Sequence, residues 1–197
     1  DCKIMASNSL DEYTITSLLI QGGPIDIFGV GERLITSKSD PVFGAVYKIA
    51  SIEKDGMWEP RIKISESVEK ITNPGLKKVY RVYNDKGRAI ADLLTLLREV
   101  PDTEEPYRYI DPEQPWRELY FENCTFKEMK QLIIKDGKLV VDLPTLEEIR
   151  AYVQDQLANE IWPEEQRFEN PHRHYLDMSP SYYQLKMDLL NRIYRKK

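Results

Sequence analysis

Cysteine and histidine are both scarce in this chain of 197 residues, which contains two of each. Cys2 and Cys124 lack the close-spaced partners of a zinc motif, and the cytosol-like composition favours two reduced thiols over a disulfide. His172 and His174 stand close together without a carboxylate motif nearby. That pattern favours a surface loop over a metal centre, so we expect no metal site in this chain.

Long apolar runs are also absent, because no stretch approaches the roughly 20 residues that span a bilayer. The first residues, Asp1-Cys2-Lys3, do not begin a signal peptide. The net charge is −5, from 28 basic and 33 acidic residues, which argues against general nucleic-acid binding. We therefore expect a cytoplasmic protein whose partners are neither membranes nor nucleic acids. The missing initiator Met suggests a fragment or a proteolysed chain.

The chain does contain a strand–helix repeat at its start. Residues 3–6 are typical of a short buried strand, and Ser7-Asn8-Ser9 forms a polar loop after it. Asp11 can cap a helix that runs to about Gln21, with Leu10, Ile15, Leu18 and Leu19 on one face. Gly22-Gly23 ends that helix, and a second strand over 25–28 follows. We expect parallel strands whose carboxyl ends carry polar groups, as in α/β barrels.

The second strand ends in Gly29-Val30-Gly31, which is followed by Glu32. Glycine has no Cβ and allows φ > 0, so backbone amides in such a loop can close on a phosphate. Amides at a loop that opens a helix also present partial positive charge to an anion. A lone Gly-x-Gly is a weak signal, because it more often forms a plain tight turn.

The rest of the chain is divided into two further regions. A period-two pattern predicts hairpins around Asp55-Gly56, around residues 84–87 and around Asp136-Gly137. Prolines make residues 98–115 a connector with little regular structure, and residues 116–121 are a possible strand. A capping box at Thr145 starts a helix that ends before Pro163, and a last helix begins near Ser181. The predicted parts are a partial α/β barrel over 1–40, a mainly antiparallel β region over 41–143 and a helical segment over 144–197.

Four stretches of the chain resemble bacterial nicotinate phosphoribosyltransferases. They are residues 4–13 with 25–31 (IMASNSLDEY and IDIFGVG), 41–48 (PVFGAVYK), 70–81 (KITNPGLKKVYR) and 168–172 (FENPH). The resemblance runs from end to end, yet it corresponds only to the carboxyl-terminal portion of that enzyme. The first barrel strands, the nicotinate-stacking aromatic and the phosphorylated histidine of the family lie upstream of it.

The resemblance implies the late βα units of a phosphoribosyltransferase barrel joined to an antiparallel sheet and terminal helices. It implies an enzyme that joins nicotinate to phosphoribosyl pyrophosphate with ATP hydrolysis, giving nicotinate mononucleotide and pyrophosphate. It also implies that the enzyme uses magnesium, forms a homodimer and includes the missing amino-terminal half. No catalytic residue is expected in this chain, which alone should be inactive. The alternatives are a nicotinamide phosphoribosyltransferase and a structural fragment with residual anion binding.

The resemblance also assigns site residues. Gly29, Gly31 and the Glu32 amide correspond to the loop that binds the substrate 5-phosphate, although the family usually has a small residue or Thr at position 32. Ser7 and Asn8 correspond to a polar pair that contacts ribose or phosphate, and their alternative role is helix capping. The candidates for pyrophosphate binding are Lys48, Lys70, Lys77 and Arg81, since a departing pyrophosphate needs cations. Their alternative role is a solvated sheet face.

Overall fold

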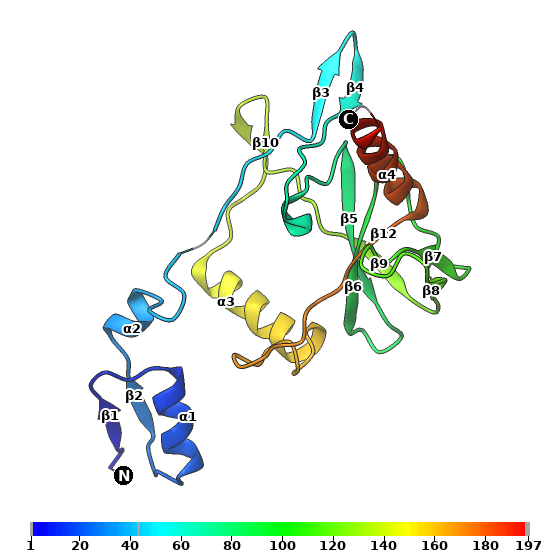
Figure 1. Ribbon diagram of the computed structural model, residues 1–197. Helices are drawn as coiled ribbons and strands as arrows, with labels where there is room; N and C mark the ends of the chain where they lie inside the picture. The colour runs from blue at the N-terminus through cyan, green and yellow to red at the C-terminus, as the bar shows by residue number, and fades with distance from the viewer. Residues whose placement is uncertain (1, 43, 196–197) are drawn as a thin grey trace. The chain divides into compact units, whose positions relative to one another are not determined.

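The computed structural model describes residues 2–42 and 44–195, which form two compact units, 1–47 and 48–197 (Figure 1). Helices and several small sheets occur together, so the predicted mixed α/β class is confirmed. One sheet has four strands and the others have two. The finer division at residues 40 and 143 stays a prediction.

The first unit is the predicted strand–helix repeat. It contains β1 (Met5–Ser7), α1 (Glu12–Ile20), β2 (Ile27–Gly29) and the short helix α2 (Glu32–Ile35). β1 and β2 are parallel, as predicted. The Asp11 carboxylate accepts a 2.8 Å hydrogen bond from the Thr14 amide and so caps α1. Gly22 has φ +75° just after the helix, which fits its predicted role in ending α1.

Most apolar side chains of the first unit are exposed. Leu10 is buried, but α1 itself has no buried residue. Leu19, on the predicted apolar face of α1, is 54% exposed. Two three-residue strands and one short helix offer too little surface to cover an apolar stripe. The apolar surface of this unit is therefore suited to packing against further structure.

The second unit is built on a four-stranded sheet in the order β12-β6-β5-β9. The predicted hairpin of β5 (Lys77–Tyr83) and β6 (Ala89–Leu96) is confirmed and forms its centre. β9 (Thr125–Glu128) pairs with β5, and β12 (Leu176–Met178) pairs in parallel with β6. Neither outer strand was predicted, because strands of three or four residues have too short a pattern to recognise.

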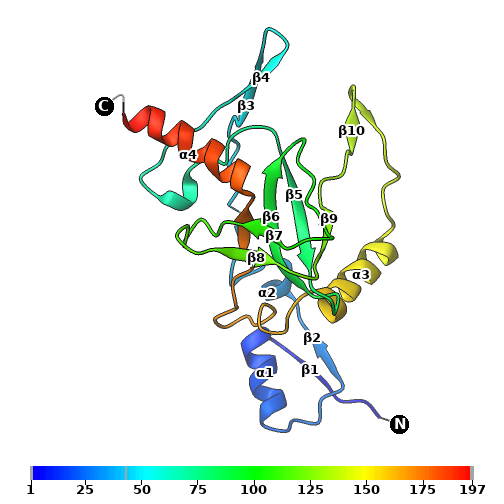
Figure 2. The same ribbon diagram turned by 90° about the vertical axis from the view of Figure 1, so that its right-hand side faces the viewer.

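Both faces of this sheet are covered. Alternation along β5 and β6 turns Val82 and Leu93 toward one face and Leu94 toward the other. The first face packs against the hairpin of β7 (Tyr107–Tyr109) and β8 (Leu119–Phe121), where Tyr109 and Phe121 stack with ring centroids 3.9 Å apart. In Figure 2, β7 and β8 lie over the strands of the sheet. The second face packs against α4 (Pro180–Tyr194) through Tyr182.

The prediction that residues 98–115 have little regular structure is wrong in part, because strand β7 lies within them. Prolines on both sides conceal the three-residue alternation of that strand. The two other predicted hairpins are present but shorter than expected. They consist of β3 (Ser51–Lys54) with β4 (Met57–Pro60) and of β10 (Ile134–Lys135) with β11 (Lys138–Leu139). A short 3-10 helix, Val68–Lys70, precedes β5.

The last third of the unit contains the two remaining helices. The capping box at Thr145 is present and starts α3 (Leu146–Asp155), which continues into the π-helical turn η2 (Gln156–Glu160). Ser179 caps α4 by accepting a hydrogen bond from the Tyr182 amide. Among the described residues, no helix is long and apolar enough to cross a membrane.

Tyr182→Phe should destabilise the second unit by about 1–3 kcal/mol, because a buried acceptor then loses its donor. The Tyr182 side chain is fully buried, and its hydroxyl donates a 2.9 Å hydrogen bond to the Pro74 carbonyl. Denaturant unfolding of the full-length polypeptide measures the effect. Tyr183→Phe, one position along the same helix, is the control and should change little. Equal losses in both variants would contradict this role for Tyr182.

Candidate functional site

The carboxyl ends of β1 and β2 lie side by side in the first unit. Ser7 pairs with Gly29 in the parallel register, so the Ser7-Asn8 loop and the Gly29–Gly31 loop leave the same edge. A Cβ on Gly29 would come within 3.2 Å of the Ser7 Cβ and 2.9 Å of the Met5 Cε. Glycine is therefore needed at position 29 for the close approach of the two strands.

The loop between β2 and α2 is open. A Cβ on Gly31 would meet nothing within 4 Å, and no side chain caps the first turn of α2. Neither glycine of this Gly-x-Gly uses the freedom to adopt φ > 0, because Gly31 has φ −110° and Gly29 is not among the positive-φ glycines. The left-handed positions lie across the edge, at Asn8 (φ 86°) and Ser9 (φ 51°). Backbone amides of a first helical turn, when no side chain caps them, can donate hydrogen bonds to an anionic group.

One ion pair connects the two helices of this unit. The Arg33 guanidinium on α2 bonds the Asp11 carboxylate, whose other oxygen caps α1. This contact holds the start of α2 in place relative to the loop after β1. Sequence reasoning missed Arg33, because a pair 22 positions apart leaves no periodic signal.

The four predicted pyrophosphate ligands all lie in the second unit. Lys48 donates a hydrogen bond to the Lys70 carbonyl, so these two residues are neighbours. Lys70 is exposed. Lys77 donates to the carbonyls of Asn73 (2.9 Å) and Gly75 (3.2 Å), in the turn just before β5. Burial, and then the nearby Lys130, lower the pKa of Lys77.

Arg81 belongs to a polar network on the face of the sheet that also carries α4. Its guanidinium makes two hydrogen bonds to Asp92, at 3.0 and 3.2 Å. His174 lies 3.5 Å from the same carboxylate through Nε2, and its Nδ1 is 3.0 Å from Glu165. His174 is therefore partly buried, contrary to the surface position expected for it, whereas His172 is exposed. The pairing gives Arg81 a structural partner on the sheet.

The charges in this network support one another. The Asp92 carboxylate, 3.5 Å from Nε2, raises the pKa of His174 against the effect of burial, and the contact with Glu165 raises it further. Burial opposes ionisation of Asp92, but the nearby His174 and the hydrogen bonds from Arg81 outweigh it and lower the pKa of Asp92. Tyr83 bonds Glu160 at 2.5 Å nearby. Together these contacts fasten the segment after α3 to the sheet.

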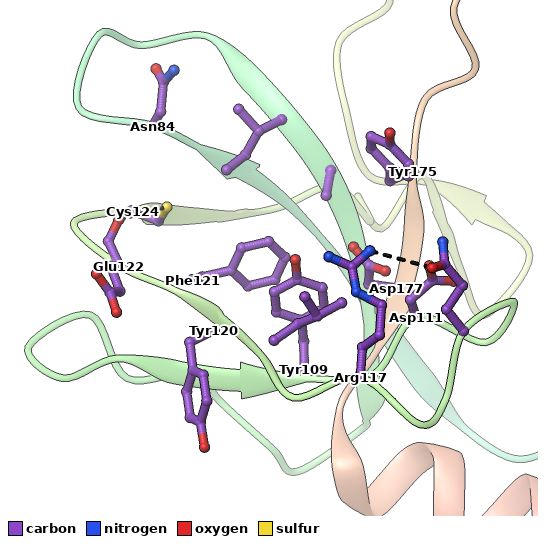
Figure 3. A pocket seen from close by; sticks show the side chains of 14 residues that line it. Asn84, Tyr109, Asp111, Arg117, Tyr120, Phe121, Glu122, Cys124, Tyr175 and Asp177 are labelled. Atoms are coloured by element: carbon purple, nitrogen blue, oxygen red, sulfur yellow. Dashed lines mark hydrogen bonds between the residues drawn. The ribbon is translucent and has the colours of Figure 1, made fainter.

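A cavity of about 530 Å³ lies on the other side of the sheet, beside the β7–β8 hairpin. Figure 3 shows Asp177, Asp111 and Arg117 at one end of it and Tyr109 beside Phe121 at its centre. Sequence reasoning missed this cavity, although an aspartate inside the apolar triplet Leu176-Asp177-Met178 was a signal. Within the residues that the structure describes, no group of three His, Cys, Asp or Glu side chains could hold a metal ion.

Stability should depend on His174 most strongly at low pH. The pKa of His174 is higher in the folded protein than in the unfolded chain, where it is about 6.5. The stabilisation by His174 is therefore complete below about pH 6.5 and is lost as the pH rises through the folded-state pKa. His174→Gln should cost on the order of 1 kcal/mol near pH 5.5 and less near pH 8.5. Denaturant unfolding at both pH values measures this difference. His172→Gln is the control, and an equal cost at both pH values would contradict the network's role.

Three comparisons with known proteins bear on the whole chain. The family model of the nicotinate phosphoribosyltransferase C-terminal domain matches residues 76–186. The nicotinate phosphoribosyltransferases of Bacillus subtilis (strain 168) and Caenorhabditis elegans are 37% and 36% identical to this chain over the matched residues. These matches cover 98% and 92% of this chain but 39% and 32% of those proteins. The crystal structure of human nicotinic acid phosphoribosyltransferase has the same fold, with a TM-score of 0.72 at 24% identity over 95% of this chain and 33% of that one. The chain therefore belongs to the nicotinate phosphoribosyltransferase family, in which it corresponds to the carboxyl-terminal portion.

Proposed function

We propose that this chain is the carboxyl-terminal part of an enzyme of NAD salvage. The complete enzyme joins nicotinate to phosphoribosyl pyrophosphate with ATP hydrolysis and releases nicotinate mononucleotide and pyrophosphate. The observation that carries the proposal is the 37% identity over 98% of this chain to a protein named nicotinate phosphoribosyltransferase. That name favours nicotinate over nicotinamide as the base.

The loop between β2 and α2 is proposed to bind the 5-phosphate of the substrate and of the product. Its support is the open space at Gly31 and the first turn of α2, which has no capping side chain. Backbone amides of Gly31 and Glu32 would donate to phosphate oxygens, while the Glu32 side chain points away from the anion. Ser7 and Asn8, at the adjacent strand end, would contact the ribose hydroxyls or the phosphate.

The first unit is proposed to complete an α/β barrel with chain that lies outside these 197 residues. Parallel strands are normally covered on both faces, yet Met5 and Ile27 are 62% and 43% exposed. The β1–β2 pair is also too small to be stable as an isolated sheet. The same proposal includes the amino-terminal half of the enzyme and assembly as a homodimer.

ATP and Mg²⁺ enter the proposal as a substrate and a cation that accompanies phosphates. Mg²⁺ commonly binds through one or two carboxylates plus substrate phosphate oxygens. The described residues lack a cluster that could hold the ion by themselves. Mg²⁺ would therefore arrive with phosphoribosyl pyrophosphate and ATP, and this chain would supply amides and cations to the phosphates.

The pyrophosphate is proposed to bind basic side chains of the second unit. Lys77 and Arg81 already bond the Asn73–Gly75 turn and Asp92, and these contacts support a positioning role for both. Lys70 is the stronger candidate for direct contact, because its side chain is exposed, and Lys48 lies beside it through a hydrogen bond to its carbonyl. Cations there would stabilise the charge of the departing group.

The full-length polypeptide should form nicotinate mononucleotide from nicotinate, phosphoribosyl pyrophosphate and ATP, whereas residues 1–197 alone should not. The fragment lacks the greater part of the length of its relatives. Chromatographic detection of the mononucleotide measures both proteins, with nicotinamide as the control base. A full-length protein that uses only nicotinamide would refute the proposed substrate. Full turnover by the fragment would refute the need for the remaining chain.

Gly31→Val in the full-length enzyme should weaken binding of phosphoribosyl pyrophosphate and of the product together. The side chain fills the space where a phosphate oxygen approaches, which costs about 1.5–3 kcal/mol for one lost charge-assisted contact. Thr36→Val places the same side chain at the exposed end of α2 and is the matched control. Titration calorimetry measures binding, and thermal unfolding without ligand checks the fold. Unchanged binding in a folded Gly31→Val protein would remove this loop from the site.

A further inference from the structure

The cavity beside the β7–β8 hairpin is not used in the proposed reaction. Its volume of about 530 Å³ is in the range of small-molecule sites. Strands β6, β7, β8 and β12 and the loops after β7 and β8 contribute to its walls (Figure 3). The lining combines acidic and aromatic side chains, with Arg117 as its single basic member.

Asp177 is a buried acidic residue in the wall of this cavity. The strand that carries it is held on both sides, by parallel pairing with β6 and by hydrogen bonds of 2.8 and 2.9 Å between Met178 and Ile110. The residue is 4% exposed, and its side chain lines the cavity. Among the described residues, none donates a hydrogen bond to its carboxylate. In the described part of the chain, the only buried polar side-chain atom without a hydrogen-bond partner is Nε2 of His174, so the Asp177 oxygens are open to the cavity and a ligand there can reach them.

The charged groups around Asp177 do not neutralise it. Burial, and then the charge of Asp111, raise the pKa of Asp177 to about 7, while His174 has a smaller opposite effect. Arg117 is exposed, and its guanidinium bonds Gln114 at 3.4 Å. None of the ion pairs within 4.0 Å among the described residues joins Arg117 to Asp111 or Asp177. Two carboxyl groups therefore share one end of the cavity without a bound counter-charge.

Aromatic rings form the neighbouring wall. Tyr109 stacks on Phe121, with an interplanar angle of 12°, which fixes the orientation of its ring. Tyr120 and Tyr175 also line the cavity. The faces of aromatic rings attract cations, and a planar guanidinium can stack on them. The wall therefore suits the same kind of ligand as the two carboxyl groups.

We propose that this cavity binds an organic cation with a guanidinium or ammonium head, held by Asp177 and Asp111 and packed against the wall of Tyr109. The proposal goes beyond the phosphoribosyl reaction, whose ligands are anions. The head group belongs either to a free small molecule or to a side chain of the polypeptide outside these 197 residues. Both sources share one chemistry, a cation that pairs with a buried carboxylate.

Methylguanidinium is a suitable probe, and the full-length polypeptide with ¹³C-labelled aspartate carboxyl groups is the sample. If the ligand is free, the probe should bind saturably and move the pKa of Asp177 below about 7. Asp177→Asn should weaken binding by on the order of tenfold or more, as expected for losing a charged hydrogen-bond partner. Asp136→Asn removes the same charge from the exposed turn between β10 and β11 and should leave binding unchanged.

If a side chain of the same polypeptide supplies the cation, the full-length protein should show a low Asp177 pKa without any probe. The probe should then not bind. If the cation is a lysine, a carbodiimide should cross-link it to Asp177; if it is an arginine, Asp177→Asn should destabilise the protein. Asp111→Asn, at a half-buried position, is the second variant in case Asp177→Asn does not fold. It should lower the affinity for the probe or, if the cation is a side chain, raise the pKa of Asp177. A neutral Asp177 whose titration no cation alters would overturn the proposal.

Discussion

The long pairing of β5 with β6 supports everything else in the second unit. Seven pairs of residues hold these strands together, from Lys77 opposite Leu96 to Tyr83 opposite Ala89. Because side chains alternate along each strand, one hairpin supplies two apolar faces. The β7–β8 hairpin covers one face and α4 covers the other. The polar network of Arg81 and the cavity of Asp177 both depend on strands that this pairing holds in place.

Two aspartates of this sheet, the half-buried Asp92 and the buried Asp177, have opposite environments. Asp92 has Arg81 and His174 beside it, and its ionised form is favoured. Asp177 has a second carboxyl group as its neighbour, and its neutral form is favoured. The difference follows from position, since Asp92 faces the segment after α3, whereas Asp177 faces a cavity. The paired charges around Asp92 hold the fold together, whereas the unpaired carboxyl group of Asp177 marks a place where a ligand can bind.

Each unit carries its own candidates for phosphate contact. The loop proposed to bind the 5-phosphate lies in the first unit, and the proposed pyrophosphate ligands lie in the second. Two of those candidates, Lys77 and Arg81, bond carbonyls and a carboxylate of their own unit, so internal pairing accounts for their positions. Lys48 likewise bonds a backbone carbonyl, that of Lys70, whereas the Lys70 side chain is exposed. Exposure therefore distinguishes Lys70 from the three basic residues that are half-buried.

The sequence by itself determined the elements whose signals are local. Glycine turns, the capping residues Asp11 and Thr145 and the alternation over residues 77–96 specify the hairpins and helices, and the motifs specify the family. Only the tertiary structure decided which distant groups meet, such as Arg33 with Asp11, or His174 with Asp92. It also decided that Asp177 is buried beside a cavity. Pairings across long separations follow from packing of the whole chain, and they leave no periodic signal in the residues that make them.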